Sequence, residues 1–169
     1  MALVLDGNGD ITGLVAGALP ANVIGTGSVI QTATTFISGK NSTTSSSYTD
    51  LAKSNSFTPS SSSNRILVFI SCQMGNAGSA GNVLFAIGRS VSGGSSSAIA
   101  DVQNLLASAT YANFPFSYIY LNSPATTSAL TYSIMGRRED GDGTPFVGGR
   151  NSDSFYQWGT YITLMEIAG

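Results

Sequence analysis

RILVFISCQM, residues 65–74, points most directly to the fold class, because it is a nearly continuous run of apolar residues. TPSSSSN precedes it and GNAGSAG follows it, and both stretches are rich in residues that interrupt regular elements. A short apolar run between such breaks is typical of a β-strand that is buried on both faces. Cys72 shares one face with Ile66, Val68 and Ile70, which predicts a buried, unreactive thiol.

Similar stretches recur along the chain, separated by loop-like spacers, and they show the alternation of apolar and polar residues that indicates strands. The pattern predicts a hairpin at 3–15 and strands at 28–37, 48–57, 65–74, 82–91, 111–121, 129–138 and 159–168. Strands at such intervals favour a sandwich, and about eight strands in two sheets is the usual content of a jelly roll. We therefore predict an all-β fold, an antiparallel β-sandwich that is jelly-roll-like and has an extended N-terminal arm.

The segment SAIADVQNLLAS, residues 97–108, is compatible with two structures. Ile99, Val102, Leu105 and Leu106 have helical spacing, and Ser97 is a suitable N-cap. An irregular strand followed by a loop fits the same residues. Strand order is likewise open, because periodicity does not determine it.

The first 31 residues differ in character from the rest of the chain. They carry only two charges, Asp6 and Asp10, and no basic residue precedes Lys40, so they lack the positive start of a secretory signal. Glycines, Pro20 and Asn22 interrupt the apolar run too often for a membrane-spanning helix. We predict that residues 1–31 form an arm that docks on another protein and that residues 32–169 form the sandwich. The apolar residues expected to bind that partner are Leu3, Leu5, Ile11, Leu14, Val15, Leu19, Val23 and Ile24.

Composition argues against most enzymes and against nucleic-acid binding. The chain has no His and one Cys, which removes the Ser-His-Asp triad and the usual zinc ligand sets. Seven scattered basic residues and a net charge of −2 do not suit nucleic acid as a partner. A two-carboxylate hydrolase stays formally open because nine acidic residues are present. We expect a non-enzymatic protein without metal, cofactor, nucleic-acid or membrane partner.

Charges and aromatic rings are concentrated late in the chain, between residues 137 and 158. Charge combined with rings on a glycine-rich loop is typical of a recognition surface. The alternative is a solvated loop with weak salt bridges. The candidate recognition residues are Arg137, Arg138, Asp140, Asp142, Phe146, Arg150, Tyr156 and Trp158.

A second aromatic group lies on one face of the strand predicted at 111–121. Phe114, Phe116, Tyr118 and Tyr120 alternate there, which suits either sugar stacking or burial in a core or subunit interface. We favour the core or interface. Pro115 lacks an N–H group, which predicts an edge or bulge position for this strand.

Several phrases of the sequence resemble small virion proteins of tailed bacteriophages, of the tail-fibre-like type found in cyanophages and marine phages. These phrases are ALVLDGNGDITGLVAGALP, YTDL, FTPSSSSNRILVFIS, LNSPATTSALTYSIMGR and GTYITLMEIAG, and they cover most of the chain except 137–158. The resemblance implies a virion surface component, a homotrimer with a β-sandwich domain, whose N-terminal segment attaches to the particle.

Together these observations predict a structural protein of a phage particle, made in the host cytoplasm. The favoured role is a short tail fibre or appendage subunit, with a tail or major capsid protein as its partner. A capsid decoration (cement) protein is the first alternative, and a carbohydrate-binding module that recognises host surface glycan is the second.

Overall fold

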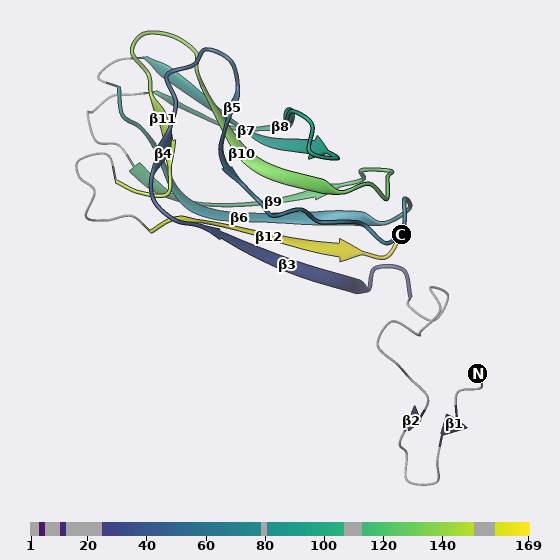
Figure 1. The fold of residues 1–169 in the computed structure, drawn as a ribbon. Coiled ribbons are helices and arrows are strands. Elements are labelled where there is room, and N and C mark those ends of the chain that lie inside the picture. Colours follow the sequence, from purple (N-terminus) through teal and green to yellow (C-terminus); the bar gives the residue numbers. More distant parts are fainter. Residues whose placement is uncertain (1–3, 6–10, 13–24, 79–80, 107–112, 151–157) are drawn as a thin grey trace.

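Every regular element that the computed structural model describes is a β-strand, and all paired strands are antiparallel (Figure 1). The structure describes residues 4–5, 11–12, 25–78, 81–106, 113–150 and 158–169. Within these ranges no helix is long and apolar enough to cross a membrane. The predicted all-β class is confirmed.

The main strands form two sheets that face each other across a common core (Figure 1). The first sheet has the order β3 (Val29–Ile37), β12 (Thr160–Ile167), β6 (Arg65–Asn76) and β9 (Asn113–Asn122). The second has the order β5 (Thr49–Lys53), β10 (Leu130–Arg138), β7 (Asn82–Val91) and β8 (Ser97–Leu106).

Three further pairings complete the described structure. β11 (Pro145–Val147) lies beside the end of β6, past the start of β12, and β4 (Asn41–Ser42) pairs with β11. β1 (Val4–Leu5) pairs with β2 (Ile11–Thr12), as the predicted hairpin at 3–15 requires.

The strand order is that of a jelly roll. Numbered along the chain, the eight main strands run 1-8-3-6 in the first sheet and 2-7-4-5 in the second. Two sheets of four strands with this interleaving are the hallmark of the double Greek key. The predicted jelly-roll-like sandwich is therefore confirmed from the pairing itself.

The sandwich begins before residue 32. β3 starts at Val29, and Val29 and Gln31 pair with β12. Just before it, the backbone N–H of Gly27 donates to the carbonyl of Ala168 at 2.9 Å. These residues, which the sequence places in the arm, thus hydrogen-bond to the last strand of the domain and to the residue that follows it.

Strand β6 divides its residues between the core and the outside. Ile66, Val68 and Ile70 are fully buried, whereas Leu67 and Phe69 are only half-buried. The prediction that residues 65–74 are buried on both faces is therefore wrong for the odd-numbered positions. The second sheet covers one face of β6, and the pleat sends alternate side chains to the other face.

The described part of residues 97–108 is an irregular strand, so the helical alternative is wrong there. β8 pairs with β7, and the register shifts between Phe85 and Ala86 and between Ile87 and Gly88. Each shift leaves one extra residue in β8, as in a β-bulge. Ile99, Val102 and Leu105, three positions apart, consequently all pack against the core, and this spacing resembles that of a helix.

Glu166 is a carboxylate on the inner face of β12, in phase with the core residues Ile162 and Leu164. It accepts hydrogen bonds from Gln31 Nε2 at 2.6 Å, Ser60 N at 2.7 Å and Asn64 Nδ2 at 2.6 Å, and from the Ser60 hydroxyl at 2.8 Å. Burial by itself raises the pKa of Glu166, but these hydrogen bonds lower it by a larger amount. The pKa of Glu166 therefore lies below its ordinary value. The carboxylate ties the end of β12 to β3 and to the loop before β6.

Phe146 is fully buried in β11, so its prediction as a surface recognition residue is wrong. β11 fills the place beside β6 that β12 leaves vacant, where Phe146 is opposite Gly75. The Lys40 ammonium lies 4.9 Å from the centre of the Phe146 ring. The ring is part of the packing at this end of the sandwich.

We predict that Glu166→Gln lowers the free energy of unfolding at neutral pH by about 1–3 kcal/mol, because backbone and side-chain donors lose a charged acceptor. Since folding lowers the pKa of Glu166, its contribution is complete above the ordinary glutamate pKa and is lost as pH falls through the folded value. Urea unfolding of both proteins between neutral and acidic pH measures the difference. A difference that stays constant down to strongly acidic pH would contradict this role.

Phe146→Ala should destabilise the domain by about 3–5 kcal/mol, because it removes a fully buried ring. Val91→Ala is the matched control, since Val91 is 41% exposed at the end of β7 and should change stability by less than about 1 kcal/mol. Chemical unfolding monitored by circular dichroism compares them. Similar small losses of stability in both variants would contradict the burial of Phe146.

Candidate recognition surface

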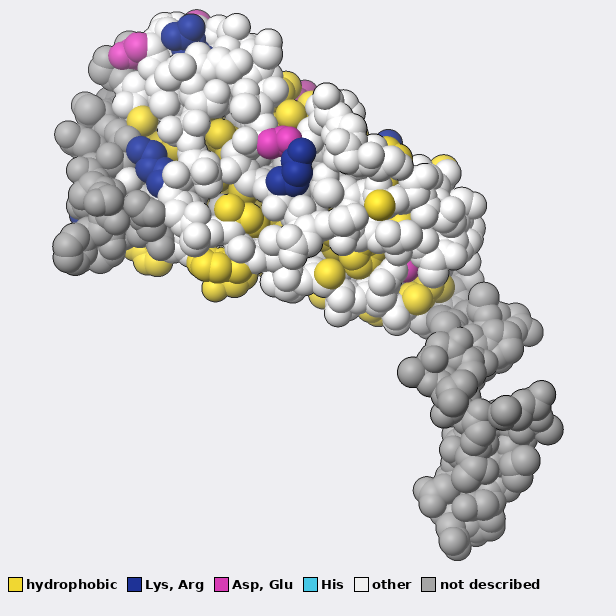
Figure 2. All heavy atoms as spheres, viewed as in Figure 1, with side chains coloured by type: hydrophobic (Ala, Val, Ile, Leu, Met, Phe, Trp, Pro, Cys, Tyr) yellow, Lys and Arg dark blue, Asp and Glu magenta, His cyan; other side chains and the backbone are white. Residues whose placement is uncertain are grey.

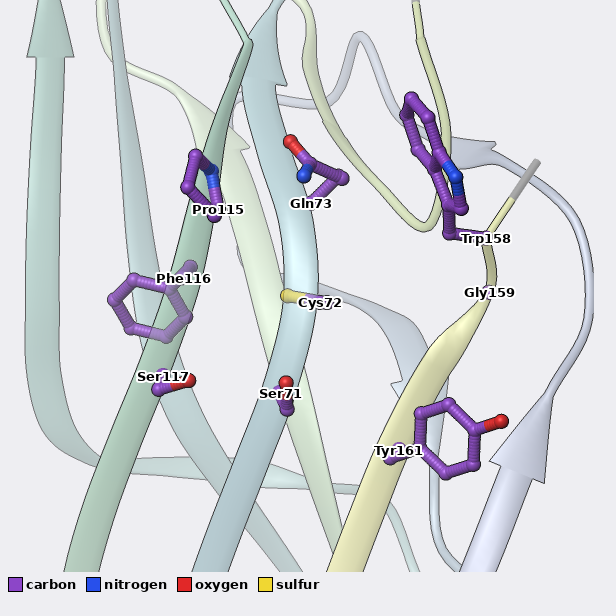
Figure 3. Close-up of a pocket in the computed structure, with 9 residues that line it drawn as sticks. All are labelled: Ser71, Cys72, Gln73, Pro115, Phe116, Ser117, Trp158, Gly159 and Tyr161. Atoms are coloured by element: carbon purple, nitrogen blue, oxygen red, sulfur yellow. The ribbon is translucent and has the colours of Figure 1, made fainter. Parts of the chain in front are cut away.

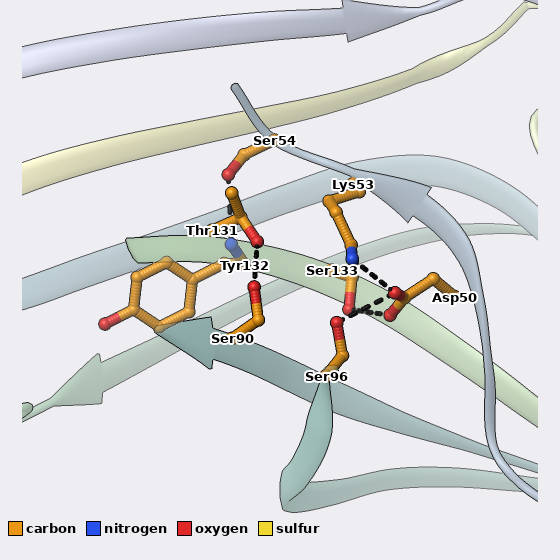
Figure 4. Close-up of polar contacts among 8 residues, drawn as sticks. All are labelled: Asp50, Lys53, Ser54, Ser90, Ser96, Thr131, Tyr132 and Ser133. Atoms are coloured by element: carbon orange, nitrogen blue, oxygen red, sulfur yellow. Dashed lines mark hydrogen bonds and ion pairs between the residues drawn. The ribbon is translucent and has the colours of Figure 1, made fainter. Parts of the chain in front are cut away.

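The outer face of the second sheet carries polar side chains that bind one another (Figure 4). Asp50 pairs with the Lys53 ammonium at 2.7 Å and accepts hydrogen bonds from Ser96 at 2.8 Å and Ser133 at 2.5 Å. Burial raises the pKa of Asp50, but Lys53 and the two serines lower it more, which favours the charged carboxylate. This face satisfies its own polar groups.

The outer face of the first sheet has the opposite character, and we call it the contact face. Its side chains alternate with the inward-facing residues of the same strands, and the one charged side chain in this phase, Arg65, lies at the border of the face. Figure 2 shows hydrophobic side chains along the lower margin of the domain, where this face lies in the matching view of Figure 1. The contact face comprises Thr32, Thr34, Phe36, Leu67, Phe69, Ser71, Gln73, Pro115, Ser117, Ile119, Leu121, Tyr161, Thr163 and Met165.

Five neighbouring residues make the middle of the contact face apolar, and we call them the apolar patch. The strand register places Leu67 between Met165 and Leu121, and Phe69 beside Ile119. Ile119 is 61% exposed and Leu121 is 44% exposed. A patch in which large apolar side chains adjoin one another is typical of a protein interface, whereas scattered ones are ordinary.

The end of the contact face near the start of β12 is a shallow hollow of about 210 Å³, the aromatic hollow (Figure 3). Trp158 and Tyr161 lie along one side and Pro115 and Ser117 along the other, with Gln73 and Ser71 between them (Figure 3). About half of each of the two aromatic side chains is exposed. Exposed rings beside hydroxyl and amide groups can stack on a sugar and hydrogen-bond to its hydroxyls.

Local backbone geometry sets the position of Trp158. Gly159 follows it with φ of +73°, a left-handed conformation that favours glycine. A side chain at this position would also come within 2.6 Å of the Ile37 carbonyl oxygen. Phe36 packs on Tyr161 with ring centres 4.8 Å apart, which completes the aromatic border of the hollow.

The structure does not gather the candidate recognition residues into one site. Arg137 belongs to the second sheet, where its guanidinium lies 5.4 Å from the centre of the Tyr48 ring and 3.7 Å from Glu139. Arg138 is the last residue of the same strand and is half-exposed. Trp158 precedes β12 and lines the aromatic hollow at the end of the contact face. The prediction of a single recognition surface over 137–158 is therefore not supported by the described residues.

The remaining residues of that group have different positions. Asp140 is exposed and accepts hydrogen bonds from the backbone and side chain of Asn82, so it braces the loop after β10. Asp142 is exposed in the same loop, and Arg150 is half-exposed after β11. Tyr156 lies outside the described residues.

Most of the predicted arm contacts fall outside the described residues as well. Leu5 lies in β1 and Ile11 in β2, where they are opposite each other. The docking of the arm on a partner remains a prediction for this set. The others, outside the described ranges, are Leu3, Leu14, Val15, Leu19, Val23 and Ile24.

The aromatic residues of β9 point toward the core, as favoured from the sequence. Phe116, Tyr118 and Tyr120 pack against the core cluster, whereas Phe114 at the end of the strand is 48% exposed. In the described part of the sheet β9 pairs with β6 alone, so Pro115 does occupy an edge strand. Cys72 is buried in β6, which confirms the predicted burial, and burial raises the pKa of its thiol to about 12, which disfavours the reactive thiolate.

The contact face itself was missed from the sequence, although its signal is present. In 65–74 and in 114–121 most even-numbered and many odd-numbered residues are apolar or aromatic. Both faces of these strands are therefore expected to be buried. The prediction of burial on both faces places the odd-numbered residues of 65–74 in the core instead. Among the described residues, no group of three or more acidic, cysteine or histidine side chains is placed to hold a metal ion.

Comparison of the chain with protein-family models gives no match, and comparison with curated proteins gives none either. A solved structure of infectious bursal disease virus, Gx strain, is similar with a TM-score of 0.38 and 11% identity, over 83% of this chain and 38% of that chain. The VP2 subviral particle of infectious bursal disease virus is similar with a TM-score of 0.34 and 10% identity, over 84% of this chain and 39% of that chain. The chain thus spans about two fifths of these longer proteins, and neither similarity assigns it to a family.

Proposed function

We propose that this chain is a non-enzymatic structural protein of a bacteriophage particle, displayed on the particle surface as a homotrimer. In this proposal the N-terminal arm attaches the protein to the virion, and the jelly roll faces outward as a short tail fibre or appendage subunit. The sequence phrases that resemble tail-fibre-like virion proteins support the phage assignment. Jelly rolls are frequent among viral particle domains, which is consistent with it.

The observation that carries the proposal is the contact face on an otherwise polar domain. Only 9% of the residues are charged, and the exposed large apolar side chains include Phe36, Ile119, Leu121, Trp158 and Tyr161 on one sheet face. A free monomer would gain nothing from displaying them, and they favour association in water. Such a surface suits a protein whose working state is an assembly.

A carbohydrate-binding role is the second candidate, and the aromatic hollow favours it. Trp158 and Tyr161 offer exposed rings, and Gln73, Ser71 and Ser117 offer hydrogen-bonding groups within the same hollow. On a surface appendage this combination would recognise a host surface glycan. The role adds receptor binding to display and needs no catalytic group.

Deleting residues 1–24 should leave a folded sandwich, because the deletion spares the Gly27 hydrogen bond to Ala168 and all of β3. We expect the truncated protein to be absent from purified particles when it replaces the full chain during infection, as measured by quantitative mass spectrometry. Normal incorporation would overturn the arm as the attachment segment. Loss of folding by circular dichroism would assign residues 1–24 to the domain instead.

Antibody labelling of intact particles separates the two virion locations. Label at the tail supports the fibre or appendage role. Label over the capsid shell would replace that role with the alternative of a capsid decoration (cement) protein.

Trp158→Ala should weaken glycan binding with little effect on thermal stability, since the Trp158 side chain is 50% exposed. The loss of one stacked ring predicts a decrease in affinity of roughly tenfold or more. Glycan-array binding followed by calorimetry measures it, and Phe114→Ala, an exposed ring outside the hollow, is the matched control. If the full chain binds no glycan, the carbohydrate role is excluded, and if the two variants bind equally well, the aromatic hollow is excluded as the binding site.

A further inference from the structure

The contact face is a candidate interface, because its apolar patch is continuous from β12 across β6 to the edge strand β9. Ile119 and Leu121 are largely exposed, and Leu67, Phe69 and Met165 are half-buried beside them. The second sheet already covers the inner side of the same strands. Burial of this patch therefore needs a surface outside the described fold.

The chemistry of the contact face narrows the choice of occupant. Membrane surfaces and nucleic acids are bound through Lys and Arg, and the contact face has neither. Arg65 lies at its border, opposite Ile167 in the strand pairing. A partner protein recognised by charge is disfavoured for the same reason.

A second copy of this chain meets the remaining requirements. An uncharged face meets its own copy without electrostatic repulsion, and Thr34 and Thr163 already satisfy each other by a hydrogen bond of 2.9 Å. Four strands spaced about 4.8 Å apart and about eight residues long give roughly 500 Å² of flat area per copy. Two copies that meet face to face would bury at least about 1,000 Å², which reaches the lower limit of a specific interface. In a closed trimer the same area of each copy is divided between two neighbours.

We infer that copies of this chain associate with one another through the contact face, with the apolar patch at the centre of the interface. The inference deepens the proposed homotrimer, on which it rests, by assigning the surface that forms it. In a closed trimer three such faces converge on one axis, and each copy contacts two neighbours. The polar outer face of the second sheet then faces solvent, and the aromatic hollow lies at the rim of the interface.

Ile119→Lys in the full-length chain tests this assignment directly. Ile119 is 61% exposed on the edge strand β9, so lysine can be accommodated without disturbing the core. Size-exclusion chromatography with light scattering should show an oligomer for the unaltered chain and a 17.3 kDa monomer for the variant. Val91→Lys, at an exposed apolar residue of the second sheet, is the matched control and should remain oligomeric.

The outcomes distinguish this inference from the proposed function. An oligomer that persists in Ile119→Lys, and in Leu121→Lys as a second variant, would overturn the contact face as the interface but leave the homotrimer standing. An unaltered chain that is monomeric at all concentrations would overturn both the contact-face interface and the homotrimer. The deletion of residues 1–24 tests attachment through the arm separately. Circular dichroism of each variant verifies that a change in mass reflects dissociation, and Leu121→Lys decides the matter if Ile119→Lys does not fold.

Discussion

The structure depends on the pleat of β6, which must place two sets of apolar side chains on opposite sides of one strand. Ile66, Val68 and Ile70 form the middle of the core, and Leu67 and Phe69 are sent outward by the same geometry. β6 is also the strand that joins β12, β9 and β11 in the first sheet. Because alternate residues of β6 are apolar on both sides of the strand, the jelly roll buries one set and leaves the other set on its outer face.

The two outer faces of the sandwich differ in how their side chains are satisfied. In the second sheet Asp50 pairs with Lys53 and accepts hydrogen bonds from Ser96 and Ser133. Ser90 and Thr131 form a separate hydrogen-bonded pair, so these polar groups have partners within the domain. In the first sheet the apolar patch has no such partners within the described chain. The asymmetry suggests a division of roles in the proposed particle, with one face for contact between subunits and the other for solvent.

Much of the fold could be predicted because period-2 patterns and turn-rich spacers report strands directly. Strand order could not, since pairing between distant segments leaves no local pattern. β8 shows the limit at the level of one element, because two bulges placed Ile99, Val102 and Leu105 at a spacing that strands and helices share. The position of Phe146 is hard to predict because its sequence neighbours are charged or glycine-rich, although β11 buries it. Glu166 is inward-facing like Ile162 and Leu164, but a charged residue is not expected in the core from sequence alone.

The central claim is that assembly covers the contact face and leaves the second sheet free. An experimental structure of the assembled protein at side-chain resolution measures this most directly. The account predicts that Phe69, Ile119 and Leu121 of each copy are buried against neighbouring copies, with the Asp50 network facing solvent. A structure in which copies meet through the second sheet, or in which Ile119 stays open to solvent in the assembly, would contradict it.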